Sequence, residues 1–279
     1  LTAIRRDIEN RLHPAMTGGI AGRDFSAHLE ELFEQFYSAS ESDHDYSILS
    51  LDARKAFDSV THPYIIATAK HIGLPSWVIN IIKGLFHKAS AQFTLDKDTL
   101  LRLLKGVRQG CPLSCLLFLI CMHPLLTKLA QTPRILPHSF VDDITLGLPN
   151  HTALLTILPA VDDFTAHSGL HMNEHKTTII TAQDHPELRF WIRRCLTGAW
   201  QNLQHADEIK SLGYRVGADV TPTEIWAKPI EKFCARLTAA TPPLRRSNTH
   251  TRHTIYNQFL YPILSYHLSQ FPGEVKSTC

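Results

Sequence analysis

The stretch Ile135–Leu148 reads ILPHSFVDDITLGL and places two adjacent acids, Asp142 and Asp143, between two apolar runs. Aromatic and β-branched residues on both sides of a short polar pair are typical of a β-hairpin. The pattern therefore predicts a hairpin over 135–148 with both acids at its tip. Carboxylates held beside apolar surface are costly unless a cation or a hydrogen bond compensates them.

A third acid ends another predicted strand. The run Tyr46–Leu51 (YSILSL) is short and β-prone and leads directly to Asp52. Oxygen ligands of this kind suit Mg²⁺, and two ions about 3.5–4 Å apart stabilise both the attacking and the leaving oxygen of a phosphoryl displacement. An adjacent pair of acids is also common in ordinary turns, so other motifs must decide whether a metal site is present.

Five motifs follow one another along the chain. They read LDARKAFD at 51–58, GVRQGCPLS at 106–114, FVDD at 140–143, HSGLHMNEHK at 167–176 and SLGY at 211–214. Taken together, they resemble the reverse transcriptases of non-LTR (LINE-type) retrotransposons, with group II intron enzymes more distant. The resemblance covers most of the chain and implies an RNA-directed DNA polymerase.

The resemblance implies catalytic roles for the acids and for one lysine. Asp52 and Asp142 would be the principal ligands of two Mg²⁺ ions, with Mn²⁺ as a possible substitute. Asp143 would be a further ligand or would orient the site, and the backbone carbonyl of Ala53 would complete the set. Lys176 is a candidate general acid toward the leaving pyrophosphate or a stabiliser of its charge; the alternative is a solvated lysine before a strand.

The substrate-binding candidates lie near Asp52 and in the 106–114 loop. Phe57 stands where the family has the residue beneath the incoming sugar, and a bulky ring there would exclude a 2′-hydroxyl; the alternative is a core phenylalanine. Gln109 offers an uncharged hydrogen-bonding group, and Gly110 permits close backbone approach. Arg108 would meet a phosphate or a structural carboxylate.

Other residues of the motifs carry further expectations. Asp58 is interpreted as a helix N-cap for the segment that follows it. Leu212, Gly213 and Tyr214 resemble the strand that grips the primer. Val141 stands where the family more usually has alanine, and Cys115 where proline is frequent.

The order of predicted elements favours an α+β fold. Helices are expected at 1–13, 24–39, 61–72, 76–88, 113–131 and 151–168, and residues 186–200 are expected to be helical or irregular. Strands are expected at 46–51 and 177–181, with a strand pair broken by Gly213 over 209–216. A hairpin over 91–104 would turn at Asp96–Asp98, and helices over 223–240 and 250–268 would be separated by Thr241-Pro242-Pro243. Because strands and helices do not alternate regularly, we expect an antiparallel sheet with helices packed on one side.

The resemblance gives this fold its domains. It implies a right-hand polymerase whose palm holds the antiparallel sheet. Residues 1–45 would be part of the helical fingers, 46–220 the palm with a finger insertion near 60–105, and 221–279 the start of a helical thumb or connection.

Charge is uneven along the chain. The formal net charge is +2 (28 Lys and Arg, 26 Asp and Glu), but residues 221–279 hold seven Lys or Arg and three Glu. That segment is therefore +4 and the remainder −2. A basic end on a near-neutral body fits a surface that follows a nucleic-acid backbone, and a solvated basic tail fits equally well. We expect the segment from Lys228 to Arg252, with Arg245 and Arg246, to bind the template–primer backbone.

Six cysteines without a Cys-x-x-Cys pair indicate neither a disulfide framework nor a zinc site. The longest apolar run is too short to span a bilayer, and no signal peptide is visible. The first residue is leucine, so the chain is expected to be part of a longer protein with endonuclease and RNA-binding domains. The expected partners are an RNA template, a DNA primer and dNTPs, within the cell, in a nucleus or a ribonucleoprotein particle.

Three other functions compete with the reverse transcriptase interpretation. A domesticated or decayed relative would bind nucleic acid without catalysis, although the intact acids argue against decay. An RNA-dependent RNA polymerase would share the palm, but Phe57 argues against an enzyme that must accommodate a 2′-hydroxyl. A generic phosphoesterase would have no use for the 106–114 loop.

Overall fold

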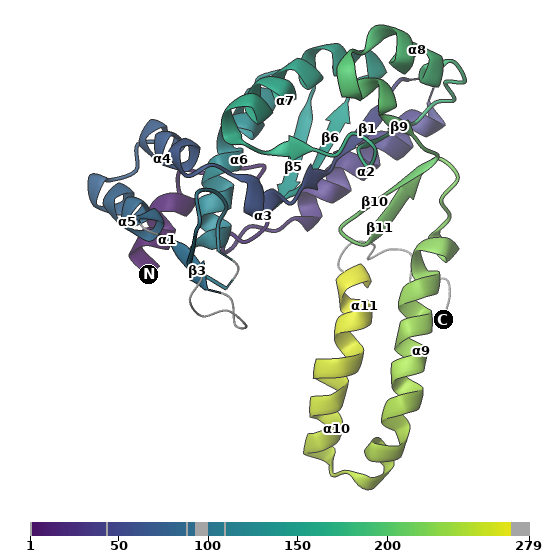
Figure 1. The fold of residues 1–279 in the computed structure, drawn as a ribbon. Coiled ribbons are helices and arrows are strands. Elements are labelled where there is room, and N and C mark those ends of the chain that lie inside the picture. Colours follow the sequence, from purple (N-terminus) through teal and green to yellow (C-terminus); the bar gives the residue numbers. More distant parts are fainter. Residues whose placement is uncertain (1, 43, 88, 93–99, 109, 269–279) are drawn as a thin grey trace.

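A five-stranded sheet forms the centre of the molecule (Figure 1). The computed structural model describes residues 2–42, 44–87, 89–92, 100–108 and 110–268. The strand order is β5 (Leu136–Phe140), β6 (Asp143–Leu148), β1 (Ser47–Leu51), β8 (Thr178–Thr181) and β9 (Gln204–His205). Neighbouring strands are antiparallel except β8 and β9, which are parallel. The predicted α+β class with an antiparallel-rich sheet is confirmed.

The central strand β1 is apolar because both faces of the sheet are covered. Successive side chains of a strand point to opposite faces. Leu49 and Leu51 enter the larger core, whereas Ile48 enters a second core. All three side chains are buried, which explains why this strand reads as a nearly continuous apolar run.

Helices cover the larger core. They are α1 (Thr2–Glu9), α4 (His62–His71), α5 (Ser76–Phe86), α6 (Ser114–Ala130) and α7 (Leu154–Ser168). Helix α6 is buried over most of its circumference, since Leu116 through Met122 are all inaccessible to solvent. A helix that is apolar all round belongs inside a layered domain.

The second face of the sheet is covered by helix α2 (Ser26–Glu41) and a two-stranded ribbon, β10 (Glu208–Ser211) and β11 (Tyr214–Gly217). Phe36 of α2, Ile180 of β8 and Tyr214 of β11 pack together there. The expectation of helices on one side is therefore wrong for α2. Its apolar stripe of Leu29, Leu32 and Phe36 needs a partner, and the second face of the sheet supplies it.

His138 on β5 is buried on this second face without a hydrogen bond to either ring nitrogen among the described residues. Its ring stacks on that of His28 from α2, with 5.6 Å between the centroids. Burial, with a smaller contribution from the nearby His28, lowers the pKa of His138 to about 4. The imidazole is therefore neutral in the folded protein at neutral pH.

We expect His138 to make the fold sensitive to acid. Below about pH 6.5 the unfolded chain binds a proton at this residue and the folded chain does not, so stability is lost as the pH falls toward 4. The loss attributable to His138 is about 3 kcal/mol at most. Urea unfolding at pH 7.5 and at pH 4.5 should show a smaller loss for His138→Phe than for the unaltered protein. His175→Gln, at an exposed histidine, is the control, and an equal loss in all three proteins would contradict the prediction.

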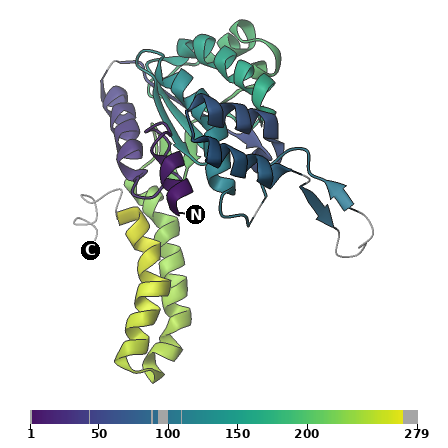
Figure 2. The same ribbon diagram turned by 90° about the vertical axis from the view of Figure 1, so that its left-hand side faces the viewer.

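Short elements join the sheet to the helices. They are β2 (Ala53–Arg54), α3 (Ala56–Ser59), β7 (His171–Met172), α8 (Leu188–Cys195) and the 3₁₀ turns His151–Ala153 and Gly198–Asn202. The hairpin expected over 91–104 pairs β3 (Ser90–Gln92) with β4 (Leu100–Arg102) and projects from the body in Figure 2. Its expected turn at Asp96–Asp98 lies outside the described residues.

The chain continues into a helical hairpin that extends from the body (Figures 1 and 2). Helix α9 (Pro222–Arg246) starts at a capping box formed by Thr221 and Glu224. Helix α10 (Thr249–Ile255), a π-helical turn (Tyr256–Leu260) and α11 (Tyr261–Leu268) run back along α9. None of the described helices combines the length and apolarity needed to cross a bilayer.

The expected break at Thr241-Pro242-Pro243 is wrong, because α9 passes through it. Each proline lacks the N–H that would bond the carbonyl four residues earlier. Those carbonyls belong to Thr238 and Ala239, both exposed, so water can replace the missing bonds.

Two cations of the segment from Lys228 to Arg252 stabilise the helical hairpin. Arg236 Nη1 donates to the Phe259 carbonyl (3.1 Å), and Arg252 Nε donates to the Leu244 carbonyl (3.0 Å). Binding of a nucleic-acid backbone by this segment stays a prediction.

Candidate functional site

The three acids lie at one end of the sheet. Leu51 of β1 pairs with Ile144 of β6, so Asp52 follows β1 beside Asp143 at the start of β6. Phe140 pairs with Asp143, which places Asp142 in the two-residue turn between β5 and β6. Burial raises the pKa of Asp143, and the Asp142 and Asp52 carboxylates raise it further. The predicted hairpin is thus present, with its acids close enough to repel one another.

The donor chemistry of this group fits a hard divalent cation. Asp52, Asp142 and Asp143 supply carboxylate oxygens, and the Ala53 carbonyl follows directly. The like charges of Asp52 and Asp142 raise the pKa of Asp143. A bound cation would relieve this repulsion. Among the described residues, however, no group of three or more His, Cys, Asp or Glu side chains is already arranged to hold a metal ion. The side chains would have to reorient around an ion.

The segment 171–177 fixes the backbone of Asp52 from both sides. The Asp52 N–H donates to Thr177 Oγ1 (3.3 Å), and its carbonyl accepts from the Asn173 N–H (2.7 Å). Strand β2 pairs with β7, Ala53 opposite Met172. Thr177 is fully buried and was not singled out from the sequence, where it reads only as the start of a β-branched run.

Lys176 lines an open pocket that also includes Asp52, Ala53, Lys55 and Asn173. Its side chain is exposed, so the structure places it beside the acids without burying it. Lys55 is a second lysine of the same pocket, in a left-handed conformation (φ 45°) between β2 and α3. Lys55 was not singled out from the sequence, although it lies within the LDARKAFD motif.

Phe57 lies at the boundary between core and surface. Its half-buried ring stacks on the fully buried Phe118 of α6, with centroids 4.7 Å apart and planes 14° apart. Its carbonyl accepts from the Val107 N–H (2.7 Å), which ties the turn after Asp52 to the 106–114 loop. Asp58 is exposed within α3, whereas Thr61 precedes α4. The N-cap interpretation of Asp58 is therefore wrong, because the helical turn begins earlier, at Lys55.

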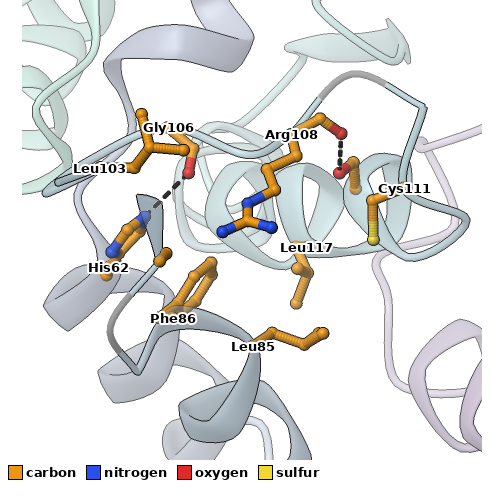
Figure 3. Close-up of a pocket in the computed structure, with 10 residues that line it drawn as sticks. His62, Leu85, Phe86, Leu103, Gly106, Arg108, Cys111 and Leu117 are labelled. Atoms are coloured by element: carbon orange, nitrogen blue, oxygen red, sulfur yellow. Dashed lines mark hydrogen bonds between the residues drawn. The ribbon is translucent and has the colours of Figure 1, made fainter. Parts of the chain in front are cut away.

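The 106–114 loop leads from β4 into α6, and several of its residues line the pocket shown in Figure 3. Gly106 has φ 83°, and a Cβ there would lie 2.9 Å from the Asp58 carbonyl oxygen, so glycine is required. His62 Nε2 lies 2.9 Å from the Gly106 carbonyl, and its ring stacks on Phe86 at 3.9 Å. His62 was not singled out from the sequence.

Arg108 extends over a pocket lined by His62, Phe86 and Leu117 (Figure 3). It is exposed, and within the described part of the chain no carboxylate lies within ion-pair distance of it. The Ser114 hydroxyl donates to its backbone carbonyl. Gly110 (φ 85°) is exposed, with no atom within 4 Å of an added Cβ. Gln109 lies outside the described residues.

The ribbon β10–β11 places the SLGY motif over the face that carries the acids. Leu212 (φ 49°) and Gly213 (φ 94°) form its two-residue turn. Ser211 Oγ and Thr145 Oγ1 lie 3.2 Å apart in a buried contact, and Thr145 stands two residues after Asp143. Tyr214 is fully buried, so its side chain anchors the ribbon.

The acid-bearing turn is supported by the N-terminal segment. Val141 has φ 59°, which is costly for a β-branched residue. Ser139 Oγ donates to the Val141 carbonyl (3.1 Å). Thr17 N–H donates to the Ser139 carbonyl (2.9 Å), so residues 15–17 cover the free edge of β5. A Cβ on Gly18 would lie 2.6 Å from the Val141 nitrogen.

We expect Gly18→Ala to displace the acid-bearing turn. The added methyl group meets backbone atoms that cannot rotate away, so the change should cost about 1–3 kcal/mol. It should also lower the DNA synthesis that the sequence resemblance leads us to expect. Gly84→Ala is the matched control, since an added Cβ in helix α5 meets nothing within 4 Å; it should be neutral or stabilise by up to about 1 kcal/mol. Thermal unfolding and primer extension measure both effects. Equal behaviour of the two variants would show that Gly18 does not support the turn.

A family model described as "Reverse transcriptase (RNA-dependent DNA polymerase)" matches residues 1–216. A retrovirus-related Pol polyprotein from the type-1 retrotransposable element R2 of Popillia japonica is 30% identical over 194 residues. A 149 kDa protein of transposon TX1 from Xenopus laevis is 24% identical over 179 residues. These matches cover 65% and 60% of this chain but only 27% and 14% of the relatives' own lengths.

The fold is also similar to solved structures. Apo telomerase from Candida tropicalis, truncated from its C-terminal domain, superposes with a TM-score of 0.56 over 78% of this chain and 44% of its own, at 12% identity. A second apo telomerase structure from the same organism gives a TM-score of 0.55 over 82% of this chain and 40% of its own, at 11% identity. At this identity the likeness shows the arrangement of the chain and no more.

Proposed function

Because this chain belongs to the reverse transcriptase family, in its non-LTR (LINE-type) branch, we propose that it is the core of an RNA-directed DNA polymerase. It extends the 3′-hydroxyl of a DNA primer along an RNA template, using dNTPs. The observation that carries the proposal is the meeting of Asp52, Asp142 and Asp143 at one end of the sheet. The 106–114 loop on one side and the β10–β11 turn on the other belong to the same proposed site.

Asp52 and Asp142 would hold two Mg²⁺ ions, or Mn²⁺, with help from Asp143 and the Ala53 carbonyl. When bound, such ions stabilise the attacking and the leaving oxygen of an in-line displacement. The protein's own contribution is to fix the position of Asp52 through Thr177 and Asn173. The turn that carries Asp142 is fixed by Ser139 and Gly18.

Lys176 would act on the leaving group. It shares an open pocket with Asp52, so its ammonium group can approach the same triphosphate that the acids position. There it would donate a proton to the departing pyrophosphate oxygen or stabilise the charge on that oxygen. Lys55 lines the same pocket and adds a second positive charge.

The nucleotide and the strands would be held by the surrounding elements. Phe57 would lie beneath the sugar and exclude a 2′-hydroxyl. Arg108, which has no carboxylate partner among the described residues, would bind a phosphate, while Gln109 and Gly110 would approach the base pair. Leu212 and Gly213 would grip the primer at the ribbon turn, which Tyr214 anchors in the core.

The proposed domains follow this arrangement. Residues 1–45 and the insertion near 60–105 would belong to the fingers, 46–220 to the palm, and the helical hairpin from 221 onward to the thumb. Endonuclease and RNA-binding functions would belong to other parts of a longer protein, because this chain spans about a quarter of the length of the first R2 relative. Such a protein would work in the nucleus or in a ribonucleoprotein particle.

Primer extension on poly(rA)/oligo(dT) with Mg²⁺ or Mn²⁺ tests the proposal. Incorporation of dTTP by the purified chain is the expected result. The second candidate function, a nucleic-acid-binding relative without catalysis, predicts binding of poly(rA)/oligo(dT) without incorporation under either ion. The intact acids favour the polymerase.

A further inference from the structure

Helix α8 presents a basic and aromatic face away from the polymerase site. Its sequence is LRFWIRRC over 188–195. Leu188 and Ile192 are buried and fix the inward side. Trp191 is half-buried, with its ring 4.9 Å from that of His151. The helix is therefore seated firmly on the body of the protein, and its outward side is well defined.

The outward side consists of Arg189, Phe190, Arg193 and Arg194, all exposed. At about 100° per residue these four positions form one continuous arc on the helix surface. Phe190 is 60% exposed. A single exposed phenylalanine is ordinary on a protein surface. Phe190, however, is flanked by three guanidinium groups on a helix without an acidic residue. Together they form a surface that is both basic and aromatic.

The three arginines of this face differ in the contacts they already make within the protein. Arg189 Nη2 donates to the His205 carbonyl (3.3 Å), and both Asp184 and Asp207 act electrostatically on His205. Arg193 and Arg194 have no carboxylate within ion-pair distance in the ranges that the structure describes. These two arginines therefore carry the uncompensated positive charge beside Phe190.

This face lies at the end of the sheet opposite the acids. His151, whose ring contacts Trp191 of α8, follows the end of β6 that is distant from Asp143. His205, which Arg189 contacts, belongs to β9 at the edge of the sheet, separated from β1 by β8. Figure 1 shows α8 and the helical hairpin on opposite sides of the molecule. A strand that occupies the polymerase site does not have to cover α8.

We propose that the outward face of α8 binds single-stranded RNA, with Arg193 and Arg194 on phosphates and Phe190 stacked on an unpaired base. Single-stranded RNA presents phosphates and unpaired bases along its length, and the α8 face presents guanidinium groups on both sides of an aromatic ring. Stacking of a base on an aromatic side chain does not depend on the RNA sequence. A membrane surface fits less well, because one outward apolar residue buries too little area. An acidic protein segment would use the arginines but gain little from Phe190.

The test measures binding of a labelled oligo(U) to the full chain while a short blunt RNA–DNA duplex saturates the polymerase site. We expect Arg193→Gln/Arg194→Gln to weaken oligo(U) binding about tenfold near 0.1 M salt. The slope of log affinity against log salt should fall in magnitude by about 0.7 for each arginine removed. Phe190→Ala should also weaken binding, and Phe190→Trp should retain it.

Two controls separate this surface from the polymerase site. Lys70→Gln/Lys128→Gln removes two exposed charges from α4 and α6 and should leave oligo(U) binding within about twofold. Primer extension on poly(rA)/oligo(dT) should be unchanged in all α8 variants. Unaltered affinity and salt slope in the double-arginine variant would overturn the proposal. So would a loss of extension parallel to the loss of binding, because the RNA would then occupy the polymerase site.

Discussion

Replacing Asp142 with alanine is expected to reduce primer extension by about a thousandfold or more, because the two divalent ions of the proposed site would lose a principal ligand. The fold should remain intact. Asp142 is exposed in the turn between β5 and β6, and its charge raises the pKa of Asp143 by repulsion. Removing that charge should leave the free energy of unfolding unchanged or slightly higher. Single-nucleotide incorporation with Mg²⁺ and with Mn²⁺, together with thermal unfolding, measures both effects.

Asp207→Ala is the matched control, since it removes an exposed acid from a turn outside the site. It should extend primers like the unaltered protein. Wild-type-like extension by a folded Asp142→Ala protein would remove Asp142 from the catalytic assignment. A loss of extension in both variants would indicate a general effect of net charge on nucleic-acid binding.

Replacing Phe57 with valine is expected to raise the ratio of rCTP to dCTP incorporation by about tenfold or more. The proposed clash between Phe57 and the 2′-hydroxyl would cost more than about 1.4 kcal/mol, and each 1.4 kcal/mol is about a factor of ten. The smaller side chain leaves room for that hydroxyl. It also leaves a cavity against Phe118, on which the Phe57 ring stacks, at a cost of roughly a few kcal/mol. The two rate constants must therefore be compared at matched concentrations of folded protein.

Phe118→Val separates the two consequences. Phe118 is fully buried behind Phe57, so its replacement should destabilise the protein at least as much. It should leave the ratio of rCTP to dCTP incorporation unchanged. An unmoved ratio in an active Phe57→Val enzyme would make Phe57 a core residue, and the preference for deoxynucleotides would need another source.

The acid-bearing hairpin and the strand before Asp52 could be predicted from the sequence. Strand-forming apolar runs and the polar residues of a turn are recognisable within a few neighbouring positions. The register that sets Asp52 beside Asp143 depends on pairing between distant strands and was available only through the family resemblance. Thr177 and Gly18 were missed for the same reason. A buried hydroxyl that accepts from a distant N–H, or a glycine pressed against a distant turn, leaves no local signal.

Two errors came from reading local preference too literally. Pro242 and Pro243 were expected to end a helix, but water can hydrogen-bond the unpaired carbonyls of an exposed helix. Asp58 was expected to cap the next helix, but a left-handed Lys55 starts a helical turn before it. In both cases the surroundings of the segment, which the sequence does not display, decided the outcome.

The position of β1 in the sheet has a consequence for how the protein is made. This apolar strand lies between β6 and β8, and both partners are synthesised long after it, at 143–148 and 178–181. At roughly 5–20 residues per second, a nascent chain would carry β1 unpaired for on the order of ten seconds. During that interval Ser47–Leu51 offers an open edge to any other extended chain. We therefore expect more soluble protein when ribosomes translate the segment from β1 to β8 without slowing. We expect the same when chaperones are more abundant.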